Sequence, residues 1–322
     1  MRVILFFIDG LGLAPACLTN PLAALDLPFM QKLLGGKKLT AEALGSHGSS
    51  VLLALDSCLS VPGEPQSATG QTTLFTGVNA ALAVGRHIRG FPTQPLRRLL
   101  AKEGLLQKVI SLGKTALFLN SYRPQFFKDG FGSRRLYSVT TWLNYYAGLP
   151  FLTLDDLVSG RAVNNDITNE QLIALNYQVP RREPEEAGKI LAQRAAEVDF
   201  LLFEYFLTDK YGHERDREKI AAALLSIDRF LEGIFAGLDT ENTLFILTSD
   251  HGNLEDLSTA GHTKNPVPLL LVGPGLADLP EMRDLTVVTP FVLQRLQGAS
   301  AGGACSTDSF RLGISLQQGG LK

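Results

Sequence analysis

The sequence has little cysteine, no long hydrophobic run and no excess of charge of either sign. Its 322 residues include three cysteines, which are far apart and form no C-x-x-C pair, so we expect reduced thiols rather than a zinc finger or a redox centre. Thirty Lys and Arg residues balance 32 Asp and Glu residues to a formal charge of −2. Such a chain has no bulk basic excess to attract nucleic acid or an anionic membrane, and we predict neither as a partner.

The N-terminal apolar run, Val3–Ile8, is only six residues long and is ended by Asp9. A signal peptide needs about 7–15 apolar residues, and a membrane span needs about 20. Neither occurs in the sequence, so we expect a cytoplasmic protein. Shares of 45% hydrophobic and 19% charged residues are typical of globular proteins. The length favours about two domains of ~150 residues each.

Short apolar runs alternate with longer helical patterns, which predicts an α/β fold with a largely parallel sheet. Each run is too uniformly apolar to have a solvent face, as is typical of buried parallel strands. Proline at a first helical position marks three helix starts, at Asn20-Pro21, Gln94-Pro95 and Glu183-Pro184, and Glu214–Phe235 has the pattern of the longest amphipathic helix. The expected strands are Val3–Ile8, Val51–Leu55, Thr115–Leu119, Phe200–Phe206, Leu244–Leu247 and Pro268–Val272.

The alternation weakens between Ser121 and Arg182, where aromatic residues and arginines crowd together. We predict that residues 121–182 form a small irregular cap or lid, inserted into a core made of residues 1–120 and 183–322. The alternative is an irregular surface segment that only packs on the core, because long loops in compact domains are either functional or simple elaborations of the fold. Ala299–Ser309 has the composition of a linker.

Three aspartates stand just past the ends of expected strands: Asp9, Asp209 and Asp250. The carboxyl ends of parallel strands lie along one edge of an open sheet, and ligands bind in the crevice there. One aspartate after a strand is ordinary turn chemistry. Three of them at one edge predict a cluster of carboxylates.

Three of the five histidines accompany these aspartates. His213 follows Asp209 by four residues, which places both on one face of a helical turn. His251 is adjacent to Asp250, and His262 follows shortly after. Each histidine alone could be structural. Because mixed carboxylate and imidazole ligands suit Zn²⁺ or Mn²⁺ better than Ca²⁺, the group together predicts a metal site.

The segment Pro65–Gly77 supplies a fourth element, since Ser67 stands where a helix could start and Gly77 where it could end. A hydroxyl there faces unpaired backbone N–H groups and the positive end of the helix dipole, which favours a phosphate oxyanion. Taken alone, the segment is also consistent with a plain serine N-cap. A neighbouring metal ion would lower the hydroxyl pKa and make Ser67 a nucleophile.

Together these motifs resemble those of the alkaline phosphatase superfamily, and most of all its branch of cofactor-independent phosphoglycerate mutases and phosphopentomutases. Five motifs occur in the family's order and span most of the chain. They are Phe7-Ile8-Asp9-Gly10, Gln66-Ser67-Ala68-Thr69-Gly70-Gln71, Thr208-Asp209-Lys210-Tyr211-Gly212-His213, Ser249-Asp250-His251-Gly252-Asn253 and His262-Thr263-Lys264-Asn265-Pro266-Val267-Pro268.

The resemblance implies a three-layer α/β/α sandwich that carries two divalent metal ions, Mn²⁺ or Zn²⁺. It makes Ser67 the nucleophile that accepts the phosphoryl group. It places Asp9, Ser67, Asp250 and His251 on one metal ion and Asp209, His213 and His262 on the other.

The sequence departs from that branch in two ways. The chain between Ser67 and Asp209 is far shorter than the domain inserted in the phosphoglycerate mutases. The motif also has Gln71 where these mutases have histidine, and Gln66 where they have Asn or Asp. Because a mutase must hold its substrate while it turns over on the phosphoenzyme, the short segment favours hydrolysis.

We therefore predict a two-metal phosphohydrolase that acts on a small phosphorylated metabolite, a phosphomonoester, through a phosphoserine intermediate. A phosphomutase on the same site is the alternative, and a metal-binding module without catalysis is a lesser one. Asp166 and Thr168 are polar enough to contact a substrate hydroxyl. The candidate substrate contacts, each of which could equally be a solvated surface charge, are Lys264, Arg86, Arg89, Arg123, Arg181 and Arg182.

Overall fold

The computed structural model describes residues 1–128 and 136–298. Its centre is a seven-stranded sheet with the strand order β2-β3-β7-β6-β1-β5-β4. The four strands β6, β1, β5 and β4 are parallel, whereas β7 runs antiparallel to β6 and to β3, and β2 antiparallel to β3. The strands are β1 (Arg2–Ile8), β2 (Gly45–His47), β3 (Ser50–Leu55), β4 (Ala116–Phe118), β5 (Phe200–Tyr205), β6 (Thr243–Thr248) and β7 (Val267–Val272).

The six expected strands are confirmed, with ends that differ by at most one residue. The strand β2 was not predicted, because its three residues are polar or glycine and only partly buried, so they carry no apolar pattern. The sheet is largely parallel at its centre, as the alternating apolar runs indicated.

The helix starts marked by proline are confirmed at Pro21, Gln94 and Pro184. The single helix expected over Glu214–Phe235 is wrong in its start, because the chain breaks between α12 and α13. Arg215 there adopts a left-handed conformation with φ 53°, and the Asp216 carboxylate caps α13 by accepting hydrogen bonds from two backbone N–H groups.

The helices that pack on the sheet are α1 (Pro21–Ala24), α2 (Pro28–Leu33), α11 (Pro184–Ala195), α12 (Leu207–Glu214) and α13 (Arg217–Gly237), together with α3 (Ser67–Thr76), α4 (Ala80–Val84), α5 (Gln94–Glu103), α6 (Leu105–Ser111), α8 (Val139–Tyr146) and α14 (Val288–Gln297). The shorter elements are α7 (Pro124–Lys128), α9 (Leu154–Val158) and α10 (Glu170–Ala174), with 3₁₀ turns at Ala41–Ala43 and Leu285–Val287.

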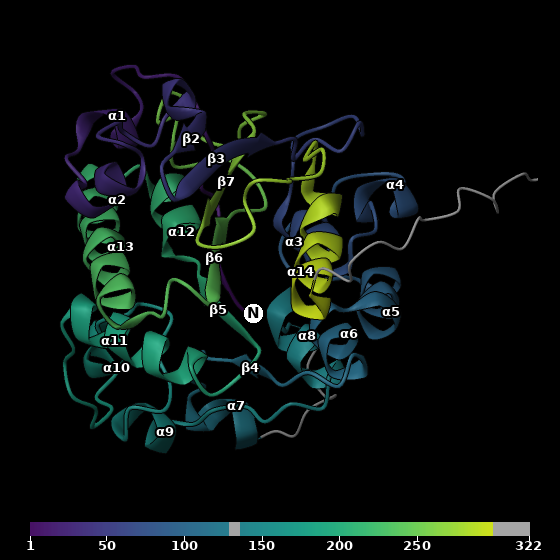
Figure 1. Cartoon of the computed structure of the whole chain (residues 1–322), viewed down its shortest axis with the longest axis vertical. Coiled ribbons are helices and arrows are strands. Elements are labelled where there is room, and N and C mark those ends of the chain that lie inside the picture. Colours follow the sequence, from purple (N-terminus) through teal and green to yellow (C-terminus); the bar gives the residue numbers. More distant parts are fainter. Residues whose placement is uncertain (129–135, 299–322) are drawn as a thin grey trace, which may run out of the picture.

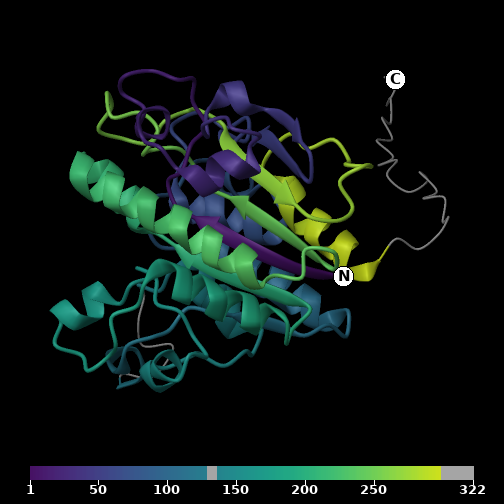
Figure 2. The same cartoon turned by 60° about the vertical axis from the view of Figure 1, so that its left-hand side comes forward.

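The helices form two layers, one on each face of the sheet (Figures 1 and 2). The helices α2, α11 and α13 cover one face, and α3, α5, α6, α8 and α14 cover the other. Alternate residues of β1 therefore enter two separate apolar clusters: Ile4, Phe6 and Ile8 enter one, and Val3, Leu5 and Phe7 enter the other. The three-layer α/β/α sandwich is confirmed.

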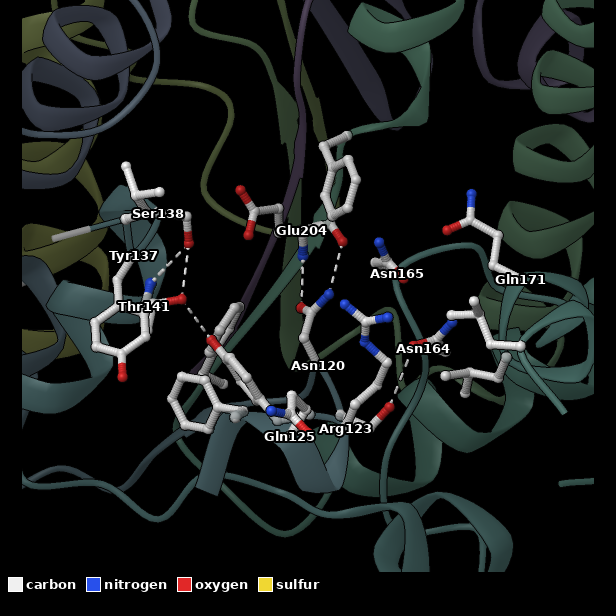
Figure 3. A pocket seen from close by; sticks show the side chains of 18 of the residues that line it. Asn120, Arg123, Gln125, Tyr137, Ser138, Thr141, Asn164, Asn165, Gln171 and Glu204 are labelled. Carbon is white, nitrogen blue, oxygen red and sulfur yellow. Dashed lines mark hydrogen bonds between the residues drawn. The ribbon is translucent and has the colours of Figure 1, made fainter. Parts of the chain in front are cut away.

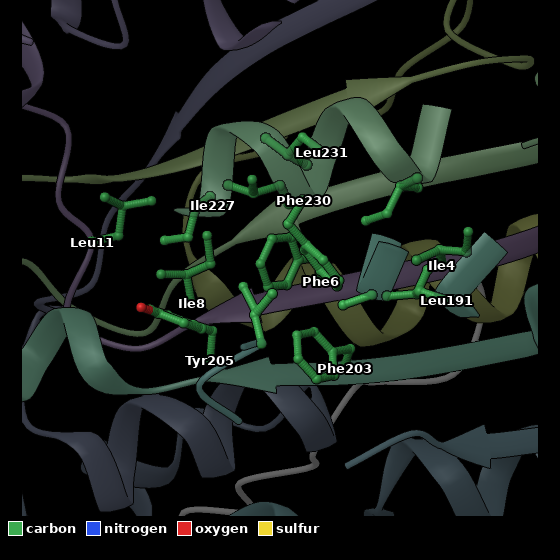
Figure 4. Packing of buried hydrophobic residues seen from close by; sticks show 14 of the residues in the cluster. Ile4, Phe6, Ile8, Leu11, Leu191, Phe203, Tyr205, Ile227, Phe230 and Leu231 are labelled. Atoms are coloured by element: carbon green, nitrogen blue, oxygen red, sulfur yellow. The ribbon is translucent and has the colours of Figure 1, made fainter. Parts of the chain in front are cut away.

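Phe6 shows how the core is packed (Figure 4). Its ring centroid lies 5.6 Å from that of Phe203 on β5 and 5.5 Å from that of Phe230 on α13. The side chain is fully buried, which stabilises the fold by roughly 1.5–3 kcal/mol. Aromatic pairs of this kind add about 0.5–1.5 kcal/mol each beyond the area they bury.

Residues 121–182 contribute buried side chains to both apolar clusters. Trp142 and Leu143 on α8 pack in the cluster beneath α5, and Leu157 and Val163 pack in the cluster beneath α11 and α13. The division of the chain into a core and a cap stays a prediction. The linker expected at Ala299–Ser309 lies outside the described residues, and among the described helices none is both long and apolar enough to cross a membrane.

Candidate metal centre at the carboxyl edge of the sheet

The sheet topology brings four distant segments to one edge. Asp9 and Asp250 follow the parallel strands β1 and β6, and Asp209 lies in the first turn of α12 after β5. Because β7 is antiparallel to β6, the segment between them returns along the same edge and carries His262. The strand β3 also ends there, and the chain after it leads to Ser67 at the first position of α3.

One group of side chains surrounds His251. Its Nε2 atom lies 3.0 Å from Ser67 Oγ, 3.3 Å from Asp9 Oδ1 and 3.5 Å from Asp250 Oδ2. His251 and Asp250 are fully buried, and Asp9 is 9% exposed. Glycine is required after Asp9, because a Cβ on Gly10 would lie 2.7 Å from the Cβ of Asp209. The structure thus brings together the four residues expected on one metal ion.

A second group surrounds Asp209. Its Oδ1 atom lies 3.5 Å from Nε2 of both His213 and His262, and these two Nε2 atoms are 3.1 Å apart. The rings of His251 and His262 stack with centroids 3.7 Å apart, so the two groups are adjacent. Ligand atoms of Asp209, His251 and His262 also lie within 4.8 Å of one another, as do those of Asp9, Asp250 and His251.

The donor atoms are those that a divalent cation needs. Each histidine places Nδ1 against a backbone carbonyl oxygen: His262 at 2.7 Å from Pro65, His251 at 3.3 Å from Gly252 and His213 at 3.4 Å from Ala260. Because a carbonyl only accepts, Nδ1 carries the proton and Nε2 keeps its lone pair, the arrangement found in metal-bound histidines.

A buried oxygen points to the same conclusion. Asp9 Oδ1 receives no hydrogen bond from the part of the chain that the structure describes. A buried carboxylate oxygen without a donor is costly, and a cation would satisfy it. The residues present therefore fit divalent metal ions.

The electrostatics of the carboxylates differ. Burial, together with the charges of Asp250 and Asp209, raises the pKa of Asp9 well above its ordinary value. Burial also disfavours the charged form of Asp209, but the neighbouring His262 and His251 and the amide of Asn253 lower its pKa overall. Repulsion among the buried carboxylates is a strain that a bound cation would remove.

Gln71 connects two of the carboxylates. Its side-chain nitrogen donates hydrogen bonds to Asp9 Oδ2 at 3.1 Å and to Asp250 Oδ2 at 3.0 Å. Gln71 stands four residues after Ser67 and so lies on the same face of α3. The sequence revealed it only as a departure from the mutase motif, and the structure shows what the glutamine contacts.

Glu255 is a residue that the sequence reasoning missed. Its Oε2 atom accepts hydrogen bonds from the backbone N–H groups of Gly12 at 3.0 Å and Asn253 at 2.8 Å, and Oε1 accepts from the Thr263 hydroxyl and from the Asn265 amide. The carboxylate is fully buried. The carboxylate of Glu255 thus connects the loop after β1 with both ends of the segment that carries His251 and His262. In the sequence, only its position five residues after Asp250 pointed to a role at this site.

Replacing Glu255 by glutamine is expected to lower the free energy of unfolding by about 2–3 kcal/mol. All four hydrogen-bond partners of Glu255 are donors. The side-chain nitrogen of glutamine, which is also a donor, would face two of them and could accept from neither. Urea unfolding of the variant measures the loss. Glu241→Gln, at an exposed position, serves as the matched control and should stay within about 0.5 kcal/mol of the parent chain. An unchanged Glu255→Gln stability would contradict the positioning role.

Glu204 on β5 is a second buried carboxyl that the sequence did not single out. Thr140 Oγ1 donates a hydrogen bond of 2.5 Å to its Oε2 atom. Burial raises the pKa of Glu204 from 4.5 to about 7; the charge of Asp250 adds to the shift and the Thr140 hydrogen bond opposes it. In turn, the charge of Glu204 contributes to the raised pKa of Asp9. Glu204 therefore lies within electrostatic reach of the metal centre.

Glu204 makes stability depend on pH with a defined sign. Between the unfolded pKa of 4.5 and the folded pKa of about 7, the native state binds more protons than the unfolded state, so its stability falls as pH rises through this window. The loss is on the order of 3 kcal/mol for a shift of this size. Glu204→Gln should remove it, so the variant should gain stability relative to the parent chain between pH 5 and pH 8.

Urea unfolding of metal-free protein at both pH values measures this difference, because the titrating groups remote from Glu204 cancel between variant and parent. Glu241→Gln again provides the exposed control. If the stability of Glu204→Gln differs from that of the parent chain by the same amount at pH 5 and at pH 8, the Glu204 carboxyl is not protonated in the native state near neutral pH.

The predicted substrate cations lie in different places. Arg123 lines a large cavity, whereas Arg181 and Arg182 line a separate one. Arg181 pairs with Glu170 at 2.8 Å, and Arg182 donates to the Leu157 carbonyl at 2.7 Å, so both are engaged elsewhere. The remaining cations, Arg86, Arg89 and Lys264, are exposed. Asp166 and Thr168 line the same cavity as Arg181, and all of these substrate contacts stay predictions.

Comparison with known proteins adds to this geometry. Residues 157–298 match the family model of the Metalloenzyme superfamily. A phosphopentomutase of Chromohalobacter salexigens is 29% identical over 263 residues, which cover 78% of this chain and 59% of that protein. The resemblance to the alkaline phosphatase superfamily is confirmed. The chain spans about three fifths of the length of that curated relative.

Solved structures show the same fold. The PH0037 protein of Pyrococcus horikoshii superposes with a TM-score of 0.59 at 13% identity, covering 94% of this chain and 99% of that one. A cold-active alkaline phosphatase of Shewanella sp. superposes with a TM-score of 0.54 at 12% identity, covering 92% of this chain and 100% of that one. The chain thus has the fold of the alkaline phosphatases, and its sequence is similar to the Metalloenzyme superfamily and to a phosphopentomutase.

Proposed function

We propose that the protein is a two-metal phosphohydrolase that acts on a phosphomonoester through a phosphoserine at Ser67. The observation that carries the proposal is the position of the Ser67 hydroxyl. It stands at the start of α3 and 3.0 Å from His251 Nε2, beside both groups of metal-ligand side chains. The positive end of the helix dipole there favours the phosphate oxyanion.

The proposal gives each side chain a role. Asp9, Ser67, Asp250 and His251 would hold one divalent ion, and Asp209, His213 and His262 would hold the other. Two such ions, Mn²⁺ or Zn²⁺ for this mixture of oxygen and nitrogen donors, would lower the pKa of the serine hydroxyl and neutralise the phosphate charge. Gln71 would orient the two carboxylates through its hydrogen bonds to Asp9 Oδ2 and Asp250 Oδ2.

The reaction then has two steps. Ser67 Oγ attacks phosphorus, so that a serine O–P bond forms, the ester O–P bond breaks and the alcohol leaves with a proton. Attack by water on the phosphoserine releases inorganic phosphate and restores the hydroxyl. Because positioning and charge neutralisation carry most of the catalysis in such transfers, the rigid sheet edge that holds these side chains suits the task.

A phosphomutase is the second candidate, and the similarity to a phosphopentomutase over 78% of this chain favours it. The two functions differ in the acceptor of the phosphoserine, which is water in one case and a second hydroxyl of the substrate in the other. A metal-binding module without catalysis is less well supported, because all seven motif positions hold residues competent for the chemistry.

Incubation of the metal-loaded protein with phosphorylated sugars and glycerates separates these functions. We expect free phosphate, measured colorimetrically, at a rate well above that of a Ser67→Ala control. Isomerised ester without free phosphate, followed by phosphorus NMR, would establish the mutase instead. No turnover on the whole panel, together with fewer than two bound divalent ions per chain, would favour the non-catalytic module.

A further inference from the structure

A cavity of about 980 Å³ lies beside the ends of β4 and β5 (Figure 3). Five segments line it: the loop with Phe91, the chain after β4 with Tyr122, the start of α8 with Thr141, the stretch from Asn164 to Leu175, and the end of β5 with Glu204. The sequence reasoning did not anticipate it, because its walls come from segments separated by tens of residues.

The cavity adjoins the residues proposed for catalysis. Glu204 lines it and directly precedes Tyr205, whose backbone carbonyl accepts a hydrogen bond of 2.9 Å from the Asp9 N–H group. Phe206, also in the lining, stands three residues before Asp209. On another side, Phe91 ends a loop whose Ile88 exchanges hydrogen bonds with Thr69 in the first turn of α3. The seven candidate site residues are not among those that line the cavity, but these contacts place it next to them.

One wall of the cavity is aromatic. The Tyr122 ring lies 4.3 Å from that of Phe126, which lies 5.3 Å from that of Tyr137. Figure 3 shows Tyr137 and Gln171 on opposite sides of the cavity. Aromatic faces of this kind stack on planar rings without selecting one ring over another.

Polar groups on the far side are available to a ligand. The amides of Asn165 and Gln171 make no side-chain hydrogen bond to the described residues, although both residues are partly buried. The guanidinium of Arg123 points into the cavity in Figure 3 and forms no ion pair within the described ranges. A planar guanidinium stacks on aromatic rings, and amides both donate and accept hydrogen bonds.

Size and chemistry together define the ligand. A pocket of this volume lies at the upper end of the range for drug-sized ligands, about 300–1,000 Å³, and far exceeds what a glycerate or a pentose needs. We infer that the cavity holds the organic group of the substrate and that this group is a nucleoside, with its base between the aromatic wall and the Asn165 and Gln171 amides. The inference rests on the proposed function and narrows its substrate to nucleoside monophosphates.

A comparison of substrates tests this directly. The metal-loaded protein should release phosphate from adenosine 5′-monophosphate with a kcat/KM at least tenfold above that for glycerol 3-phosphate, because only the larger ester fills the cavity. An equal or reversed ratio would overturn the inference, while leaving the proposed hydrolase intact.

A variant that fills the cavity sharpens the test. Leu175 lines it and is 53% exposed, so tryptophan fits there without disturbing the core. Leu175→Trp should reduce the ratio of the two kcat/KM values at least fivefold. Leu82→Trp, at a leucine 67% exposed on α4, is the matched control and should keep the parent ratio. If Leu175→Trp also keeps the parent ratio, the base does not occupy this cavity.

Binding of adenosine alone separates this inference from the proposed function. The single tryptophan, Trp142, packs 5.8 Å from the Tyr137 ring that lines the cavity. Adenosine should therefore change Trp142 fluorescence in a saturable way, less strongly in Asn165→Ala and Gln171→Ala, even if no ester is hydrolysed. No saturable change at millimolar adenosine would overturn the inference, whereas binding without any hydrolysis would overturn the proposed function and leave a nucleoside-binding cavity.

Discussion

Replacing Ser67 by alanine is expected to reduce phosphate release at least about a thousandfold. The hydroxyl oxygen is the only atom that the substitution removes, and in the proposed reaction it forms the covalent bond to phosphorus. Ser67 is also half-buried against His251, at 3.0 Å from its Nε2 atom.

The measurement is kcat/KM for the best ester of the panel, with metal content determined on the same samples. Ser111→Ala provides the control, since this exposed serine only donates a hydrogen bond to the Gln107 carbonyl on α6. Mass spectrometry should find phosphate on Ser67 in the parent chain after acid quench. A Ser67→Ala variant that keeps a tenth of the parent activity would show that the phosphoryl group passes directly to water.

Removal of divalent metal ions is expected to abolish activity and to lower the melting temperature by on the order of 10 °C. Without cations, the carboxylates of Asp9 and Asp250 share a buried site, and the lone pairs of His213 and His262 face each other at 3.1 Å. A ligand present at a thousandfold its dissociation constant adds about 4 kcal/mol per site to the stability of the native state.

Calorimetry on chelator-treated protein, before and after addition of Mn²⁺ or Zn²⁺, measures the shift. Asp250→Asn removes the charge of one proposed ligand and should reduce the metal-induced rise in melting temperature. Asp278→Asn, at an exposed aspartate, should keep the full rise. An identical melting temperature with and without metal in the parent chain would contradict a metal centre built from these residues.

Much of the fold could be predicted because buried parallel strands are continuous apolar runs. The stretch Val3–Ile8 carried that signal along its whole length, and the structure places it at the centre of the sheet. The strand β2 could not be found in this way, because Gly45–His47 pairs through its backbone alone. The sequence did not reveal the break between α12 and α13, because amphipathic spacing continues across Arg215. Only the backbone conformation reveals the cap at Asp216.

The sequence by itself determined the chemistry that is available. Asp9, Asp209 and Asp250 stand just past strand ends, so strand direction predicts that these three carboxylates meet at one edge. The set of all seven candidate residues followed from the resemblance of the motifs to those of the alkaline phosphatase superfamily. Their identities as oxygen and nitrogen donors follow from the residue types. No contact between distant segments had to be known.

The tertiary structure decided how these groups are presented. The backbone carbonyls of Pro65 and Gly252 accept from Nδ1 of His262 and His251 and so decide which ring nitrogen carries the proton. Gln71 binds the carboxylates of Asp9 and Asp250, which follow strands β1 and β6. Glu204 and the cavity beside it arise where β5 meets segments from elsewhere in the chain. Such features depend on burial and on contacts between residues far apart in sequence, which no local pattern encodes.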